Sequence, residues 1–283
     1  MNAPATPMTE AIGWELADSG ILTLSFNRPE VKNAIDTAAQ GLLVRLLVDA
    51  SRHPAVKVVV LTGAGSAFCT GADVRSMGAP DPDDALALQY GQTEAWQAHE
   101  PRVDRLKRLA QASFLLHDMG KPTIARVRGA AAGMGFSMAL ACDFRLASDD
   151  AFFVSSFARI GTPGDYGGSY FLTQLVGPSR AKEIYMLSER VGAAEALSLG
   201  MVNRVVADAE LDAATHAFAL RLAQGPSMAY RYIKENIHAA ASEPIERVLD
   251  LEARNMIRCR TSDDCREALA AFQQKRDPRF TGR

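Results

Sequence analysis

The first part of the chain alternates short apolar segments with helical patterns. Residues 12–26 form two β-prone segments around the turn signal Asp18-Ser19-Gly20, which predicts a β-hairpin. Asp36 is a suitable cap for a following helix with apolar residues at helical spacing, and Pro54 ends that helix. Residues 56–61 are apolar apart from Lys57, which is typical of a strand covered on both faces.

A second unit of the same kind follows residues 83–119, which have a helical composition and a predicted break at Pro101. The Gly- and Ala-rich residues 129–141 are expected to lead through a turn into a close-packed helix. The alternation of strands and helices favours a parallel βαβ organisation over a sandwich. The predicted strands of this unit are residues 123–127, 144–147 and 152–154.

Helical patterns alone follow residue 206. We therefore divide the chain into a disordered leader at 1–10, an α/β core at 11–207 and a helical lobe at 208–283. Apolar stripes on the lobe can pack on its own core or on a neighbouring subunit. The predicted helices of the lobe are residues 208–224, 227–240, 245–260 and 263–275.

Composition places the chain among ordinary globular proteins, with 48% hydrophobic and 23% charged residues. The net charge is −2, and the basic residues are scattered, so a nucleic-acid partner is not expected. The first residues lack the pattern of a signal peptide, and an uncharged membrane-spanning run is missing from the sequence. The four cysteines fit neither CxxC nor finger spacing, which indicates reduced thiols in a cytoplasm and argues against a metal site.

Two glycine-containing turns, at residues 63–73 and 129–135, each follow a predicted strand and are expected to run into a helix. Free backbone N–H groups at such helix starts favour negative charge. Each turn taken alone is equally well explained by tight packing of small residues. Brought together, the two turns would form an oxyanion hole.

These two turns resemble the motifs of a known family. Residues 67–74, AFCTGADV, resemble the AFxxGADΦ motif of the enoyl-CoA hydratase/isomerase (crotonase) family, and residues 129–143 resemble its GxAxGxGxxxALxCD segment. The resemblance implies an α/β fold, a crotonase-like spiral of ββα units with a helical C-terminal trimerisation region. It also implies that the backbone amides of Ala72 and Met134 hold the thioester carbonyl. Further matches lie at residues 27–29, 32–34, 196–202 and 271–280.

The same resemblance implies how coenzyme A is bound. Arg28 and Arg75 match positions that approach the CoA nucleotide, and Lys275 matches a lysine that reaches it from a neighbouring subunit. Basic side chains suit phosphates because they form charge-assisted hydrogen bonds. Coenzyme A is thus expected as part of the substrate, without a separate cofactor, in a homotrimer or a dimer of trimers.

The acid and base positions depart from the hydratases of the family, which use two glutamates. This chain has Ser137 and Phe157 there, and neither can act as a general base near neutral pH. Asp165, in the glycine-rich residues 161–168, resembles the single catalytic aspartate of dienoyl-CoA isomerases and of phenylacetate-pathway isomerases that form oxepin-CoA. An aspartate between glycines is also a common turn former. One carboxylate can move a proton between the α and γ carbons, so we expect a double-bond isomerase.

Three alternatives remain open at the level of sequence: a hydratase with atypical acid and base residues, an inactive acyl-CoA-binding homologue and, ranked lower, a dehalogenase. A dehalogenase with Asp165 as nucleophile would need a histidine base and an indole beside it. The candidates His99, His117 and Trp96 lie on the helical segment, where packing or surface roles are expected. Residues 79–119 are expected to shape the acyl pocket.

Overall fold

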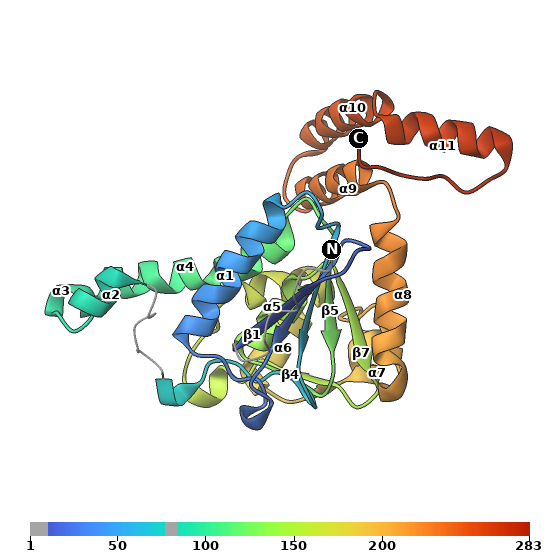
Figure 1. The fold of residues 1–283 in the computed structure, drawn as a ribbon. Coiled ribbons are helices and arrows are strands. Elements are labelled where there is room, and N and C mark those ends of the chain that lie inside the picture. Colours follow the sequence, from blue (N-terminus) through green and yellow to red (C-terminus); the bar gives the residue numbers. More distant parts are fainter. Residues whose placement is uncertain (1–10, 77–83) are drawn as a thin grey trace.

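The computed structural model describes residues 11–76 and 84–283 (Figure 1). The leader predicted at 1–10 and the start of the segment predicted to shape the acyl pocket lie outside the described residues. The strands are β1 (Ile12–Leu16), β2 (Ile21–Phe26), β3 (Val58–Gly63), β4 (Ala67–Cys69), β5 (Thr123–Val127), β6 (Ala130–Ala132), β7 (Phe144–Ser148), β8 (Phe152–Val154), β9 (Val191–Gly192) and β10 (Arg204–Val206).

The helices follow the predicted alternation with the strands. They are α1 (Thr37–Arg52), α2 (Ala85–Tyr90), α3 (Glu94–Gln97), α4 (His99–Asp118), α5 (Met134–Ala141), α6 (Gly168–Leu187), α7 (Ala193–Ser198), α8 (Leu211–Ala223), α9 (Ser227–Ala240), α10 (Ile245–Arg260) and α11 (Asp263–Gln274). Asp36 caps α1 as predicted, because its carboxylate accepts a hydrogen bond of 2.8 Å from the backbone N–H of Ala39.

Two sheets form the core of the described residues, a larger one in the order β1-β2-β3-β5-β7-β10 and a smaller one in the order β4-β6-β8-β9. The predicted hairpin is confirmed, since β1 and β2 pair antiparallel. From β2 to β10 the strands of the larger sheet pair in parallel, which confirms the predicted βαβ organisation.

The central strand β3 is buried on both faces, as the apolar residues 58–61 predict. Val58 and Val60 pack toward α8, whereas Val59 and Leu61 pack into the main core. Successive side chains of a strand point to opposite faces, so an apolar residue is needed at every position. The larger sheet therefore has a helix layer on one side and the smaller sheet and its helices on the other.

The break predicted at Pro101 is wrong. Pro101 lies in the first turn of α4, where proline is tolerated because the N–H it lacks would have no partner within the helix. The chain bends at Ala98 instead, the residue between α3 and α4. Helices α2 and α3 and the first part of α4 project from the core as one arm (Figure 1), whereas the end of α4 packs on the core through Ala112 and Leu116.

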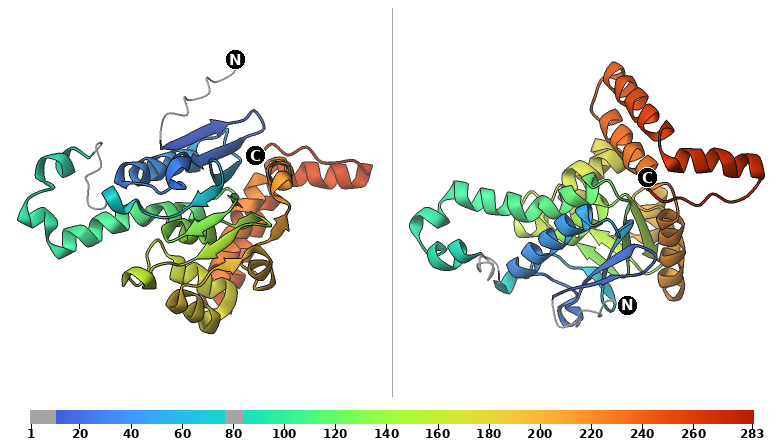
Figure 2. Two further views of the ribbon diagram at one scale, coloured as in Figure 1. Left: turned by 90° about the horizontal axis from the view of Figure 1, so that it is seen from below. Right: turned by 45° about the horizontal axis from the view of Figure 1, so that its top comes forward.

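The C-terminal helices leave the core in stages. Helix α8 packs on the larger sheet, whereas α9 to α11 extend away from it (Figures 1 and 2). Lys234 on α9 holds the first of these helices to the core through an ion pair of 2.8 Å with Asp143. The boundary placed at residues 207 and 208 stays a prediction. Among the described residues, no helix is long and apolar enough to cross a bilayer.

Candidate active site

The two glycine-containing turns lie against each other. Strands β4 and β6 pair in parallel, with Ala67 opposite Ala130, so their carboxyl ends meet at one edge of the smaller sheet. A Cβ atom built at Gly71 would lie 3.8 Å from the backbone nitrogen of Met134. Gly71 has a φ of +103° and Gly133 a φ of +55°, conformations that favour glycine. The predicted meeting of the two turns is therefore confirmed.

The helices expected after these turns differ in kind. Gly133 is followed directly by α5, which begins at Met134. The first turn is followed by a 3-10 turn, Val74–Ser76, and residues 77–83 after it lie outside the described part of the chain. The short strand β6 also lies where the sequence predicts only a turn, and it pairs with β4 and β8.

The backbone N–H groups of Ala72 and Met134 are oriented for an external acceptor. Ile35 pairs in parallel with Ala72, bonding to Gly71 and Asp73 on either side, so Ala72 directs its own N–H away from that strand. Met134 is the first residue of α5, where a backbone N–H has no partner within the helix. Both amides therefore suit the oxyanion role predicted for them.

A glycine-rich loop before α6 carries Asp165. Tyr166 anchors this loop, because its hydroxyl donates a hydrogen bond of 2.7 Å to Gln40 Oε1 on α1. The backbone N–H of Gly168 donates to the Asp165 carbonyl at 3.2 Å and closes a turn. The loop thus has a defined shape that does not depend on the Asp165 carboxylate.

One oxygen of the Asp165 carboxyl group is buried without compensation. Its Oδ1 atom is inaccessible to solvent and has no hydrogen-bond partner within the described chain. Burial raises the pKa of Asp165 from 3.8 to about 6. A turn-forming aspartate would instead bond its own backbone. A carboxyl group with a pKa in this range suits a general base near neutral pH.

The two positions that lack glutamate line the surroundings of Asp165. Ser137, on α5, is fully buried, and its hydroxyl donates to the Gly133 carbonyl at 3.4 Å. Phe157 is 8% exposed, and its ring stacks on Tyr185 with a centroid distance of 6.0 Å. Gly168 lies beside both hydroxyl groups, since a Cβ built there would be 2.3 Å from Ser137 Oγ and from Tyr185 Oη. The surroundings of Asp165 are therefore mainly aromatic.

The predicted CoA-binding arginines meet at one carboxylate. Asp73 accepts hydrogen bonds from Arg28 at 3.1 Å and from Arg75 at 2.9 Å. The Arg75 guanidinium, which supplies the largest effect, holds the pKa of Asp73 well below its usual range. Arg75 is 66% exposed, whereas Arg28 is 22% exposed. Lys275 directly follows α11, on the part of the lobe that extends from the core (Figure 2), and its contact with the coenzyme A of a neighbouring subunit stays a prediction.

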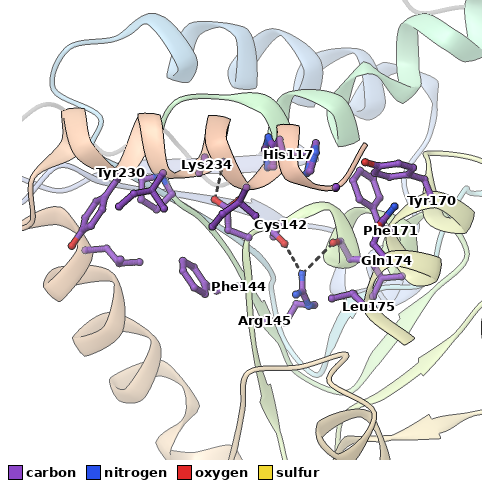
Figure 3. A pocket seen from close by; sticks show the side chains of 18 residues that line it. His117, Cys142, Phe144, Arg145, Tyr170, Phe171, Gln174, Leu175, Tyr230 and Lys234 are labelled. Carbon is purple, nitrogen blue, oxygen red and sulfur yellow. Dashed lines mark hydrogen bonds and ion pairs between the residues drawn. The ribbon is translucent and has the colours of Figure 1, made fainter. Parts of the chain in front are cut away.

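A cavity of about 520 Å³ lies elsewhere, between α9 and the core (Figure 3). Its lining includes His117, Tyr170 and Phe171 but not Asp165. The ring of His117 stacks on His238 at a centroid distance of 3.8 Å, and burial lowers the pKa of His117 to about 4. This cavity is the junction between the C-terminal helices and the core.

The partners that a dehalogenase would need are engaged elsewhere. His117 lies in the cavity under α9 (Figure 3). Trp96 lies in the projecting arm, with the Arg105 guanidinium 5.2 Å from the centre of its ring. His99 is exposed and pairs with Glu100 at 3.6 Å. The geometry therefore gives no support to the lower-ranked dehalogenase.

The comparisons with known proteins define the class. A family model described as Enoyl-CoA hydratase/isomerase matches residues 17–283, and the chain belongs to this family. The chain is 36% identical over 272 residues to the "Probable enoyl-CoA hydratase" of Rhodobacter capsulatus, covering 96% of this chain and 98% of that relative. It is 32% identical over 270 residues to the 1,2-epoxyphenylacetyl-CoA isomerase of Escherichia coli, covering 94% and 97%.

Solved structures agree with the sequence comparisons. An enoyl-CoA hydratase from Polaromonas sp. JS666 superposes with a TM-score of 0.83 at 31% identity, covering 96% of this chain and 100% of that one. The predicted crotonase-like α/β fold with C-terminal helices is thus confirmed. Because relatives of similar identity are named as hydratases and as isomerases, the class stated here is an acyl-CoA enzyme of this family.

Sequence reasoning missed two residues of this site. Tyr185 lies well down α6, where the pattern gives no sign that its side chain reaches the loop that carries Asp165. Gln40, the partner of Tyr166, lies on α1 and meets the loop only through the tertiary fold. A resemblance confined to the glycine-rich motifs could not identify either residue.

Proposed function

We propose that the protein shifts a carbon–carbon double bond in an enoyl-CoA thioester, with Asp165 as the only acid and base. The observation that carries this proposal is the buried Asp165 Oδ1, which lacks a hydrogen-bond partner among the described residues and belongs to a carboxyl group with a pKa of about 6. A base held in this state accepts a proton near neutral pH.

The reaction needs one proton transfer out and one back. The Asp165 carboxylate removes a proton from C2 of a 3-enoyl-CoA, the electron pair of that C–H bond forms a C1–C2 double bond, and the carbonyl π pair moves onto the thioester oxygen. The negative charge is delocalised onto the thioester oxygen, which the amides of Ala72 and Met134 stabilise. Asp165 then returns the proton to C4: the oxygen electron pair re-forms the carbonyl, the C1–C2 π pair becomes the C2–C3 double bond, and the former C3–C4 π electrons form the new C–H bond. The product is an isomeric 2-enoyl-CoA.

The surroundings of Asp165 favour isomerisation over hydration. Hydratases of this family activate water with two glutamates, and Ser137 and Phe157 replace them here. Phe157 and the ring of Tyr185 keep the space beside Asp165 apolar, which opposes water entry. A hydratase is the second candidate, because the hydroxyls of Ser137 and Tyr185 converge near Gly168 and could hold a water molecule.

One assay separates these functions. Purified protein is incubated with a 3-enoyl-CoA, and the conjugated 2-enoyl thioester is followed by its absorbance while products are analysed by mass spectrometry. Isomerisation gives conjugation without a change in mass. A 3-hydroxyacyl product, heavier by one water, would support the hydratase instead. Binding without any product across acyl chains would support the inactive homologue.

We further propose that the protein assembles as a homotrimer or a dimer of trimers, in the cytoplasm. Support for assembly comes from large apolar side chains that the extended helices expose; Phe272 on α11 is 85% exposed. Support for a reducing compartment comes from the cysteines, which are free thiols. The other exposed apolar residues of these helices are Ile233, Ile237, Ile245, Leu249, Met256, Ile257 and Leu269.

A further inference from the structure

The hydroxyl group of Tyr185 ends beside the loop that carries Asp165. A Cβ built at Gly164 would lie 2.8 Å from Cε1 of Tyr185, and one built at Gly168 would lie 2.3 Å from its Oη. Gly164 and Gly168 stand on either side of Asp165 in the loop. The charge of Asp165 also contributes to the raised pKa of Tyr185, as expected for neighbouring groups.

This hydroxyl is buried in apolar surroundings. Within the described part of the chain, Tyr185 Oη has no hydrogen-bond partner of acceptable geometry and is inaccessible to solvent. The phenol ring stacks on Phe157 and meets the edge of Phe136 at a centroid distance of 6.2 Å. A buried hydroxyl without a partner is unfavourable, and such groups often mark a place where a ligand completes the hydrogen bond.

Tyr185 is a hydrogen-bond donor at any physiological pH. Burial raises the pKa of its phenol to about 12, an increase that the Ser137 hydroxyl opposes and the charge of Asp165 reinforces. The hydroxyl of Ser137 donates its own proton to the Gly133 carbonyl, so the single proton of Tyr185 is available to an acceptor on a ligand. The hydroxyl groups of Tyr185 and Ser137 therefore form a polar surface beside Asp165, among side chains that are otherwise aromatic.

A hydrocarbon acyl chain has no atom that can accept a hydrogen bond from the Tyr185 hydroxyl. The thioester oxygen of the substrate is assigned to the amides of Ala72 and Met134, and the remainder of a simple enoyl group carries no acceptor. Asp165 must reach C2 and C4 to shift the double bond. Tyr185, which is next to Asp165, therefore faces an acyl atom close to C3 or C4.

We propose that Tyr185 is a specificity-determining residue, whose hydroxyl donates a hydrogen bond to an oxygen atom at or near C3 or C4 of the acyl group. The substrates it selects are acyl-CoA thioesters with an ether or hydroxyl oxygen in the acyl group, in preference to plain hydrocarbon chains. This inference rests on the proposed function to the extent that an acyl-CoA occupies the pocket of Asp165.

Pairs of saturated thioesters that differ only by oxygen in place of one methylene test the inference. Butyryl-CoA is paired with methoxyacetyl-CoA, and pentanoyl-CoA with 3-methoxypropionyl-CoA. Dissociation constants are measured by titration calorimetry for the wild type and for Tyr185→Phe. We expect the wild type to bind at least one ether about 2- to 10-fold more tightly than its hydrocarbon counterpart, the range expected for one hydrogen bond. Tyr185→Phe should lose this preference and retain hydrocarbon binding.

The control is Tyr170→Phe, on the same helix, since Tyr170 lines the cavity under α9, whose lining includes neither Asp165 nor Tyr185. It should keep the ether preference. No preference in the wild type, or a preference that survives in Tyr185→Phe, would overturn the inference. These ligands have no double bond to shift, so binding without preference contradicts this inference alone. Failure to bind any thioester would overturn the proposed function together with it.

Discussion

A Cβ atom built at Gly133 would lie 3.7 Å from the Cα atom of Gly71, so the two glycine-containing turns are in van der Waals contact. Any larger residue at either place would meet the other turn or adopt an unfavourable φ. This contact places the start of α5 beside the residue that follows Gly71. It explains why the two amides assigned to the thioester oxygen come from segments far apart in the sequence.

The position of Met134 permits removal of one donor with little change to the fold. Proline fits the first position of a helix, where its missing N–H has no role within the helix. Met134→Pro should therefore keep α5 and lose the oxyanion donor, lowering kcat about 10²- to 10³-fold. Met134→Ala is the control for the buried side chain, and its kcat should be far closer to that of the wild type. Equal rates in the two variants, with both folded by circular dichroism, would exclude the donor role.

The predicted CoA site depends on charge. Replacement of Arg28, Arg75 and Lys275 with alanine should weaken binding of CoA thioesters about 3- to 10-fold or more at low ionic strength, and the difference should shrink as salt is added. Arg254→Ala is a matched control, because Arg254 is 65% exposed and pairs with Asp250 on α10. Unchanged affinity of the triple variant at low salt would show that the phosphates bind elsewhere.

The exposed face of α11 is expected to lie in a subunit interface. Phe272→Glu places a charge on a side chain that is 85% exposed in the single chain, so it should lower the assembly to smaller species in sedimentation velocity. The control Leu88→Glu changes a residue of α2 that is 58% exposed and outside these helices, and its assembly should resemble the wild type. A wild-type protein that sediments as a stable monomer at micromolar concentration would contradict the assembly itself.

Much of the fold could be predicted because its signals are local. Residues 123–127 were predicted as a strand and form β5, and the cap at Asp36 needs only the residues that follow it. Strand β6 was missed because three alanines carry no periodic pattern, and their pairing with β4 and β8 depends on the tertiary fold. The break at Pro101 was wrong because a proline in the first turn does not end a helix.

The residues of the site also fall into those that local sequence predicts and those that only the tertiary fold brings together. The backbone donors follow from glycine motifs, since main-chain groups depend little on side-chain identity. Asp165 could be identified as a candidate from the sequence. The burial of its Oδ1 atom without a hydrogen-bond partner, however, depends on how the surrounding residues pack. Tyr185 could not be predicted, because its hydroxyl reaches the loop only after α6 packs against α5.

The pH dependence of the reaction should report Asp165. Only the deprotonated carboxylate accepts a proton from C2, and burial raises its pKa to about 6. Therefore kcat/KM should rise about tenfold per pH unit below pH 6 and level off above it. His117, with a pKa of about 4, titrates below this range. A rate that is constant through pH 6, or that falls as the pH rises, would conflict with this assignment.

The most direct test of the central claim is turnover of a 3-enoyl-CoA by Asp165→Asn, with acyl-CoA binding measured in the same preparation. Asparagine keeps the size and hydrogen-bonding reach of the side chain but removes its basicity. We predict that binding survives and that turnover falls about 10²- to 10⁴-fold. Asp18→Asn, at the exposed turn between β1 and β2, controls for the substitution and should keep full activity. Near-normal turnover of a correctly folded Asp165→Asn protein would contradict the one-base mechanism.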